Sequence, residues 1–116
     1  MLIRVDPGSA VPLFDQLAAN IRASAITGRV AAGERLPAAR ELADSLDINV
    51  HTVLRAYQQL RDEGLIELRR GRGAIVTDRA ADYGALSGAI ASVVEEARKL
   101  DVPPSTLTAL IREAYQ

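Results

Sequence analysis

The sequence has no cysteine and no tryptophan, and aromatic residues make up only 3% of its 116 residues. The lack of cysteine excludes a disulfide framework, a thiolate metal site and a cysteine nucleophile. Because aromatic side chains are scarce, a core must be built mainly from aliphatic residues, and 48% of the chain is hydrophobic. A chain of this length accommodates one small domain with an appendage, and not two full domains.

The sequence also lacks a long apolar run, a signal-peptide pattern and a strong net charge. Without the first two, we expect a soluble cytoplasmic protein with no membrane partner. The formal net charge is −1, whereas nucleic-acid-binding proteins are often basic. Phosphate contacts require positive charge on one face only, so local clusters of arginine matter more than the total.

A helix-turn-helix is predicted in the middle of the chain. Apolar residues three and four positions apart predict one helix at residues 38–46 and another at residues 49–63. Only Asp47 and Ile48 separate these helices, so they must cross sharply. Asp47 tolerates the left-handed backbone that such a turn requires better than most residues do, and Asn49 is a favourable N-cap for the second helix.

A β-hairpin is predicted directly after the second helix. Strands at residues 65–69 and 74–77 flank a tip of alternating arginine and glycine, in which the glycines permit the chain to reverse. We expect Arg35 and Leu36 to pair with this hairpin as a short strand. Arginines at such a tip can enter a minor groove, although Arg-Gly turns also occur as plain solvated hairpins.

The predicted fold class is mainly α with a small β-wing. An amphipathic helix at residues 12–27 is expected to pack behind the helix-turn-helix, with Phe14 in the core. The predicted organisation has two parts. Residues 11–79 form a winged helix-turn-helix domain, with the helix-turn-helix at about 38–63 and the wing at about 65–77. Residues 80–116 form a helical tail.

Three motifs in this order resemble the GntR family of bacterial transcription regulators. The motifs are Gly33-x-x-Leu36-Pro37-x-x-Arg40-Glu41-Leu42-Ala43, Thr52-Val53-x-x-Ala56-Tyr57-x-x-Leu60-x-x-x-Gly64-Leu65-Ile66, and Arg70-Gly71-Arg72-Gly73. The resemblance covers about two thirds of the chain. The short tail resembles the YtrA-type subfamily, which carries a small dimerising segment in place of a large ligand domain. The resemblance implies a dimeric, sequence-specific operator-binding regulator that represses its own operon.

The second helix and the hairpin supply most of the candidate DNA-binding residues. These are Arg40, Asn49, Val50, His51, Thr52, Arg55, Arg70, Gly71, Arg72 and Gly73. Arg55 can offer a bidentate pair of hydrogen bonds to guanine, and Val50 can touch a thymine methyl group. Arg40 either neutralises a phosphate or is a solvated charge near Glu41 and Asp44. Asn49, Thr52 and Val50 have purely structural alternatives, as a helix cap, a first-turn residue and a packed side chain.

Residues 78–84 are mostly small or polar, and we interpret them as a hinge. After them, two apolar stripes predict two tail helices. The first helix ends near Leu100 and the second covers residues 104–115. Because such short helices are not stable alone, we expect them to dimerise. The alternative is a monomer whose tail packs on its own first helix. The candidate dimerisation residues are Leu86, Ile90, Val93, Ala97, Leu100, Leu107, Leu110 and Ile111.

Two other function classes are open to a small winged-helix chain. A winged helix can serve protein assembly without any operator, but the arginines of the hairpin argue against that use. An enzyme is not expected, because the chain has one histidine, no cysteine and no carboxylate pair in an apolar setting. The lone histidine lacks partner ligands, so neither a metal nor a cofactor is expected. Some family members respond to small effectors; here the tail is too small to enclose one, and an effector would bind between subunits or not at all.

Overall fold

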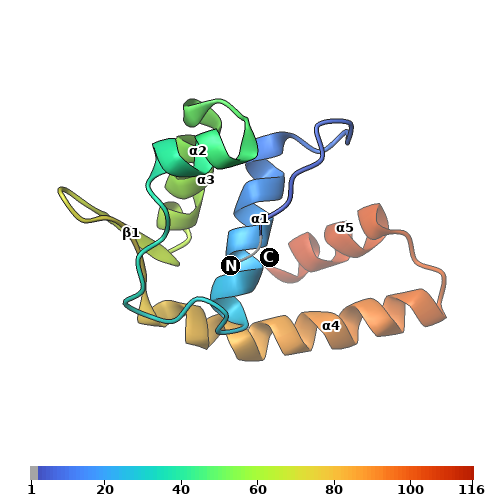
Figure 1. Ribbon diagram of the computed structural model, residues 1–116. Helices are drawn as coiled ribbons and strands as arrows, with labels where there is room; N and C mark the ends of the chain where they lie inside the picture. Colours follow the sequence, from blue (N-terminus) through green and yellow to red (C-terminus); the bar gives the residue numbers. More distant parts are fainter. Residues whose placement is uncertain (1–2) are drawn as a thin grey trace. The chain divides into compact units, whose positions relative to one another are not determined.

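The computed structural model describes residues 3–116, which divide into two compact units, one ending at Gly84 and one spanning Ala85–Gln116. The first unit continues past residue 79, where the sequence places the domain boundary. The elements follow this order along the chain (Figure 1): α1 (Leu13–Ile26), α2 (Ala39–Leu46), α3 (Val50–Asp62), β1 (Ile66–Arg69), β2 (Gly73–Val76), the 3-10 helix η1 (Asp78–Asp82), α4 (Tyr83–Lys99) and α5 (Pro104–Ala114).

The bounds of α1 follow from the residues beside it. Pro12 precedes the helix, where its missing N–H is harmless, and Gly28 follows its last turn with a φ of +80°. One side of α1 is buried, at Leu17, Ala18, Ile21, Ser24 and Ala25. Phe14 lies at the edge of this core and is only partly buried. The prediction that Phe14 packs with the core is confirmed in part, because Phe14 packs against the core cluster at its edge and Arg55 lies over its ring.

The predicted helix-turn-helix is formed by α2 and α3. Asp47, between them, has the expected left-handed conformation, with φ +55° and ψ +49°. Asn49 caps α3, since its side-chain oxygen accepts a hydrogen bond from the backbone N–H of His51 at 2.8 Å. The predicted buried stripe of α3 is confirmed, and it consists of Val53, Ala56, Tyr57 and Leu60.

Tyr57 fixes the start of α2 against α3. Its hydroxyl donates a hydrogen bond to the carbonyl oxygen of Pro37 at 2.6 Å, and the whole residue is only 3% exposed. Burial raises the pKa of this phenol to about 12. The hydroxyl therefore remains protonated, and available as a donor, at neutral pH.

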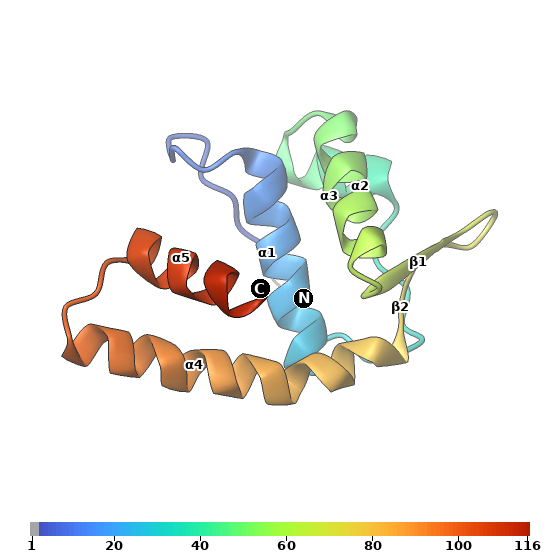
Figure 2. The ribbon, with the colours of Figure 1, turned by 180° about the vertical axis from the view of Figure 1, so that it is seen from behind.

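The hairpin of β1 and β2 projects away from the helices of the first unit (Figures 1 and 2). The two strands are antiparallel, and their last pair is Arg69 with Gly73. The connector before α2 joins the edge of the hairpin, where Arg35 forms a bridge with Ile75. The predicted pairing of this connector is confirmed, and it attaches the base of the hairpin to the domain.

The segment that was predicted as a hinge, residues 78–84, is ordered on the first unit. It contains η1, whose Ala80 is buried in the core. The hydroxyl of Tyr83 also donates a hydrogen bond to the carbonyl oxygen of Glu63 at 2.8 Å. The segment is therefore folded and not irregular, and a hinge at the boundary between the two units, which falls at Gly84, stays a prediction.

The second unit is a pair of helices, which confirms the two predicted tail helices. Within it, α5 returns antiparallel to α4 (Figures 1 and 2). The turn uses Asp101 in the left-handed conformation, with a φ of +55°, and the backbone N–H of Val102 donates to the carbonyl oxygen of Ala97 at 2.9 Å. These bonds satisfy the carbonyl groups at the end of α4.

A bidentate ion pair joins α1 to the end of α3. Arg22 donates through Nε and Nη2 to the two carboxylate oxygens of Glu63, at 2.8 Å and 2.7 Å. The side chains are 30% and 27% exposed. The hydrogen bonds from Arg22 lower the pKa of the Glu63 carboxyl, and the same bonds raise the pKa of Arg22. Folding therefore favours the charged carboxylate, and the pair stabilises the domain at neutral pH.

We expect Glu63→Gln to lower the free energy of unfolding at pH 7 by about 1 kcal/mol, as for a partly exposed bidentate pair. A lowered pKa contributes stability above the unfolded-state pKa and loses it as the pH falls through the folded-state value. The difference between variant and wild type should therefore shrink in acid, which urea titrations at several pH values measure. Glu95→Gln is the control, because Glu95 is exposed within α4 and forms no ion pair within residues 3–116. A Glu63→Gln effect that is independent of pH would contradict this role.

Candidate nucleic-acid interface

One face of α3 is exposed to solvent and carries His51, Leu54, Arg55 and Gln58. These residues follow one another at helical spacing, opposite the buried stripe. Such a face can reach base edges when a helix lies in a major groove. His51 and Arg55 were predicted as site residues, whereas Leu54 and Gln58 were missed. Extending the spacing of three and four residues from His51 along the helix would have found both.

The first turn of α3 contains both exposed and half-buried candidates. Asn49, just before it, is exposed and uses its side-chain oxygen to cap the helix. Val50 and Thr52 are half-buried, and Val50 packs against the hydrophobic core. His51 is therefore the exposed side chain of this turn.

Arg55 lies over the ring of Phe14, with 3.7 Å between the guanidinium carbon and the ring centroid. A planar guanidinium is attracted to an aromatic face and loses rotational freedom when it stacks there. Arg55 is nevertheless exposed, and it forms no ion pair with any residue between 3 and 116. Phe14 therefore holds an uncompensated positive charge beside the exposed face of α3.

The tip of the hairpin is a tight turn with two free arginines. The backbone N–H of Arg72 donates to the carbonyl oxygen of Arg69 at 3.0 Å and closes the turn. Gly71 and Gly73 have φ values of +78° and +77°, which glycine adopts without strain. Arg69 forms an ion pair within β1. Arg70 and Arg72 are exposed and have no carboxylate partner in the described part of the chain.

Arg40 is exposed in the first turn of α2, a helix whose N-cap, Ala38, makes no side-chain hydrogen bond. It forms no ion pair with Glu41, Asp44 or any other residue that the structure describes. Its charge and the first N–H groups of α2 can both attract a phosphate. The alternative role of Arg40, a solvated surface charge without a ligand, is also compatible with this geometry.

An apolar groove of about 380 Å³ lies between α3, the start of α2 with the residues just before it, and the hairpin. Leu54 of α3 and Leu68 of β1 line it, and each is 39% exposed. The charged residues among its described lining are Arg69 and Arg70, with no carboxylate. The groove therefore combines an apolar floor with a positively charged edge.

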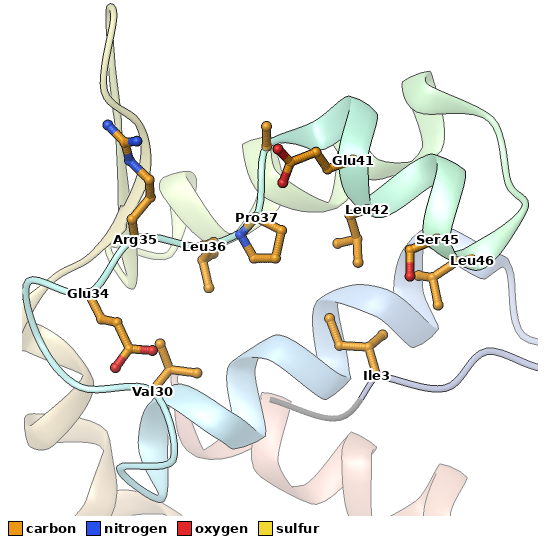
Figure 3. Close-up of a pocket in the computed structure, with 11 residues that line it drawn as sticks. Ile3, Val30, Glu34, Arg35, Leu36, Pro37, Glu41, Leu42, Ser45 and Leu46 are labelled. Carbon is orange, nitrogen blue, oxygen red and sulfur yellow. The ribbon is translucent and has the colours of Figure 1, made fainter.

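A larger cavity, of about 750 Å³, lies between α2 and the connector that precedes it (Figure 3). Ile3, Leu42 and Leu46 provide apolar side chains, and Glu34, Arg35 and Glu41 provide charged ones. Neither α3 nor the tip of the hairpin contributes to its described lining. This cavity therefore lies apart from the exposed face of α3 and from the tip of the hairpin, although Pro37 and Ala38 line both it and the apolar groove.

The candidate dimerisation residues fall into two groups within the second unit. Ala97 is buried and Leu107 is half-buried, and both line an apolar groove of about 320 Å³ that α4 and α5 share. The other six are exposed: Leu86, Ile90, Val93, Leu100, Leu110 and Ile111. So many large apolar side chains exposed on one short helical pair indicate a surface that associates with a partner.

Within residues 3–116, no group of three or more potential metal ligands is close enough to hold an ion. Over the same residues, no helix is long and apolar enough to cross a membrane. What the first unit does bring together is exposed arginines, backbone N–H groups, a histidine and an apolar groove. Groups of this kind bind phosphates and base edges without reacting with them.

Comparison of the sequence with known families gives a match to the family described as "Bacterial regulatory proteins, gntR family", over residues 13–76. The chain is 37% identical over 79 residues to the HTH-type transcriptional repressor YtrA of Bacillus subtilis (strain 168). This alignment covers 68% of the chain and 61% of that repressor. The chain therefore spans less than two thirds of the length of this relative.

Two solved structures share the fold. YtrA from Sulfolobus acidocaldarius, a GntR-family transcription factor, is 34% identical with a TM-score of 0.62, over 75% of this chain and 99% of that one. The DNA-binding domain of AraR in complex with operator ORX1 is 23% identical with a TM-score of 0.58, over 65% and 93% of the two chains. These matches confirm the predicted winged-helix fold and the GntR and YtrA resemblance. The relatives are transcription regulators and not enzymes, as was predicted for this chain.

The stack of Arg55 on Phe14 can be tested without DNA. In a double-mutant cycle, we expect Phe14→Leu and Arg55→Gln to show a coupling of about 0.5–1 kcal/mol in the free energy of unfolding, because either substitution alone removes the interaction. Urea denaturation of the four proteins measures it. Arg61→Gln, an exposed arginine nearer the end of α3, is the control and should not couple to Phe14→Leu. A coupling near zero for the Phe14 and Arg55 pair would contradict the stack.

Proposed function

Because the chain belongs to the GntR family of bacterial regulatory proteins, we propose that it is a transcription regulator that binds operator DNA sequence-specifically as a homodimer. In this proposal, the exposed face of α3 enters a major groove and the tip at residues 70–73 enters an adjacent minor groove. Its effect is repression of its own operon in the cytoplasm. The name of the similar repressor YtrA supports repression.

The observation that carries the proposal is the set of unpaired positive charges around α3. Arg40, Arg55, Arg70 and Arg72 are all exposed, and none has an ion-pair partner among residues 3–116. Such arginines can replace the counterions of DNA phosphates even though the whole chain carries a net charge of −1. Arg55 is also exposed on α3, and an arginine on a helix in the major groove can make a bidentate contact to guanine.

The homodimer is supported by the exposed apolar side chains of α4 and α5. A second copy of the same helical pair would cover Leu86, Ile90 and Leu110, which are otherwise 55%, 48% and 52% exposed. A two-fold dimer also presents two copies of α3 to two half-sites of an operator. The alternative function, a protein-assembly module without an operator, leaves the unpaired arginines without a use.

Binding to the duplex upstream of its own gene and to a scrambled duplex, measured by fluorescence anisotropy across salt concentrations, tests the proposal. We expect tighter binding to the native duplex, with affinity that falls steeply as salt rises. Arg55→Gln should weaken native-duplex binding by about tenfold or more, the range for a lost bidentate base contact. The double variant Arg70→Gln and Arg72→Gln should weaken binding to both duplexes.

Arg112→Gln, an exposed arginine in α5, is the matched control and should bind both duplexes as wild type does. Wild-type protein that binds neither duplex at low salt would overturn the proposal and leave the assembly module as the remaining function.

Sedimentation equilibrium tests the dimer. Wild type should be dimeric, and Ile90→Asp or Leu110→Asp should be monomeric, because each substitution would bury a charge in the dimer interface. Val11→Asp, at an exposed apolar position of the first unit, should remain dimeric. A monomeric wild type would contradict the homodimer.

A further inference from the structure

Leu54 is a large apolar residue of α3 that belongs neither to the hydrophobic core nor to the partly buried residues packed against it. It lies on the outward face of α3, three residues after His51 and four before Gln58, and it is 39% exposed. The buried side of the same helix is complete without it, because Val53 and Ala56 are fully buried there. Leu54 therefore contributes little to the core and leaves apolar surface at the centre of the face that meets DNA in the proposed function.

The apolar surface of Leu54 is not isolated. Leu68, on β1, is also 39% exposed and lines the same groove of about 380 Å³. A single exposed leucine is common on protein surfaces, but two that come from different elements and line one groove form a patch. Such a patch is a place where a partner makes contact.

The charges around this groove indicate the chemistry of the partner. Arg69 and Arg70 are the charged residues of its described lining, and His51 and Arg55 are exposed on the same face of α3. The partner should therefore be anionic and should also carry apolar groups. DNA meets both conditions, since the C5-methyl group of thymine is the apolar feature of base edges in the major groove.

We infer that Leu54 is a specificity-determining residue that contacts the C5-methyl group of a thymine in each operator half-site. This inference rests on the proposed function and names part of the sequence that the operator must contain. It also relocates the apolar contact that the sequence assigned to Val50, which packs half-buried against the core. Leu54 is one helical turn further along and has the exposed side chain.

Replacing thymine by deoxyuridine tests the inference, because it removes the methyl group and leaves every hydrogen-bonding group of the base in place. A duplex is first selected with wild-type protein from a random library long enough for two half-sites. Each thymine is then replaced singly by deoxyuridine, and affinity is measured by anisotropy. We expect one thymine in each half-site at which the replacement weakens binding about fourfold, the effect of one buried methyl group.

Variants of Leu54 connect that thymine to this residue. Leu54→Ala should bind the thymine and deoxyuridine duplexes equally, and Leu54→Met, which retains an apolar side chain of similar size, should keep the difference. Val11→Ala is the matched control, since Val11 is 49% exposed and lies outside the groove; it should behave as wild type. Urea denaturation should give Leu54→Ala a stability only modestly below wild type, because Leu54 is 39% exposed and lies outside the core.

Three results would overturn the inference. They are a wild-type protein that is insensitive to every deoxyuridine replacement, a difference that persists in Leu54→Ala, and a selected duplex with no thymine in its half-sites. If Arg55→Gln still weakens binding to the selected duplex in these cases, the proposed function stands and only the role of Leu54 fails. If wild type selects no duplex at all, the proposed function fails and the role of Leu54 fails with it.

Discussion

The packing of α1 against α3 is the contact on which the rest of the first unit depends. Leu17 and Ile21 of α1 and Val53 and Leu60 of α3 are completely buried in one hydrophobic cluster. Because these residues fix the rotation of α3 about its own axis, they determine which side chains face outward. The Arg22–Glu63 ion pair and the stack of Arg55 on Phe14 join the same two helices. The core therefore presents the exposed face of α3, although no core residue belongs to that face.

The distribution of charge explains how a nearly neutral chain can offer a surface for DNA. Arg22 and Arg69 are each neutralised by a carboxylate within 2.8 Å. The arginines at the tip of the hairpin have no such partner within residues 3–116. Ion pairs thus hold the domain together in one place and leave positive charge uncompensated in another. Net charge is a poor guide to such a surface, because phosphates respond to the local field.

Local patterns were sufficient for most of the fold. Helical spacing and turn chemistry predicted the helices, the left-handed Asp47 and the Arg-Gly hairpin, because these depend on residues close together in sequence. The stack of Arg55 on Phe14 could not be predicted, since it joins residues far apart in the chain. Val50 and Leu54 show the same limit: both are apolar residues of α3, and only the packing of the first unit shows that the first is half-buried and the second exposed. The burial of η1 likewise required the folded structure.

The most direct measurement is the change in backbone amide NMR signals when the isotope-labelled protein is titrated with a selected operator duplex. We expect the largest changes at residues 51–58 of α3 and at residues 70–73 of the hairpin, because these segments would enter the grooves. The amides that line the cavity beside α2, near Glu34 and Ser45, should change little. Changes concentrated at that cavity or in α5, with α3 and the hairpin unaffected, would contradict the assignment of the DNA-binding surface.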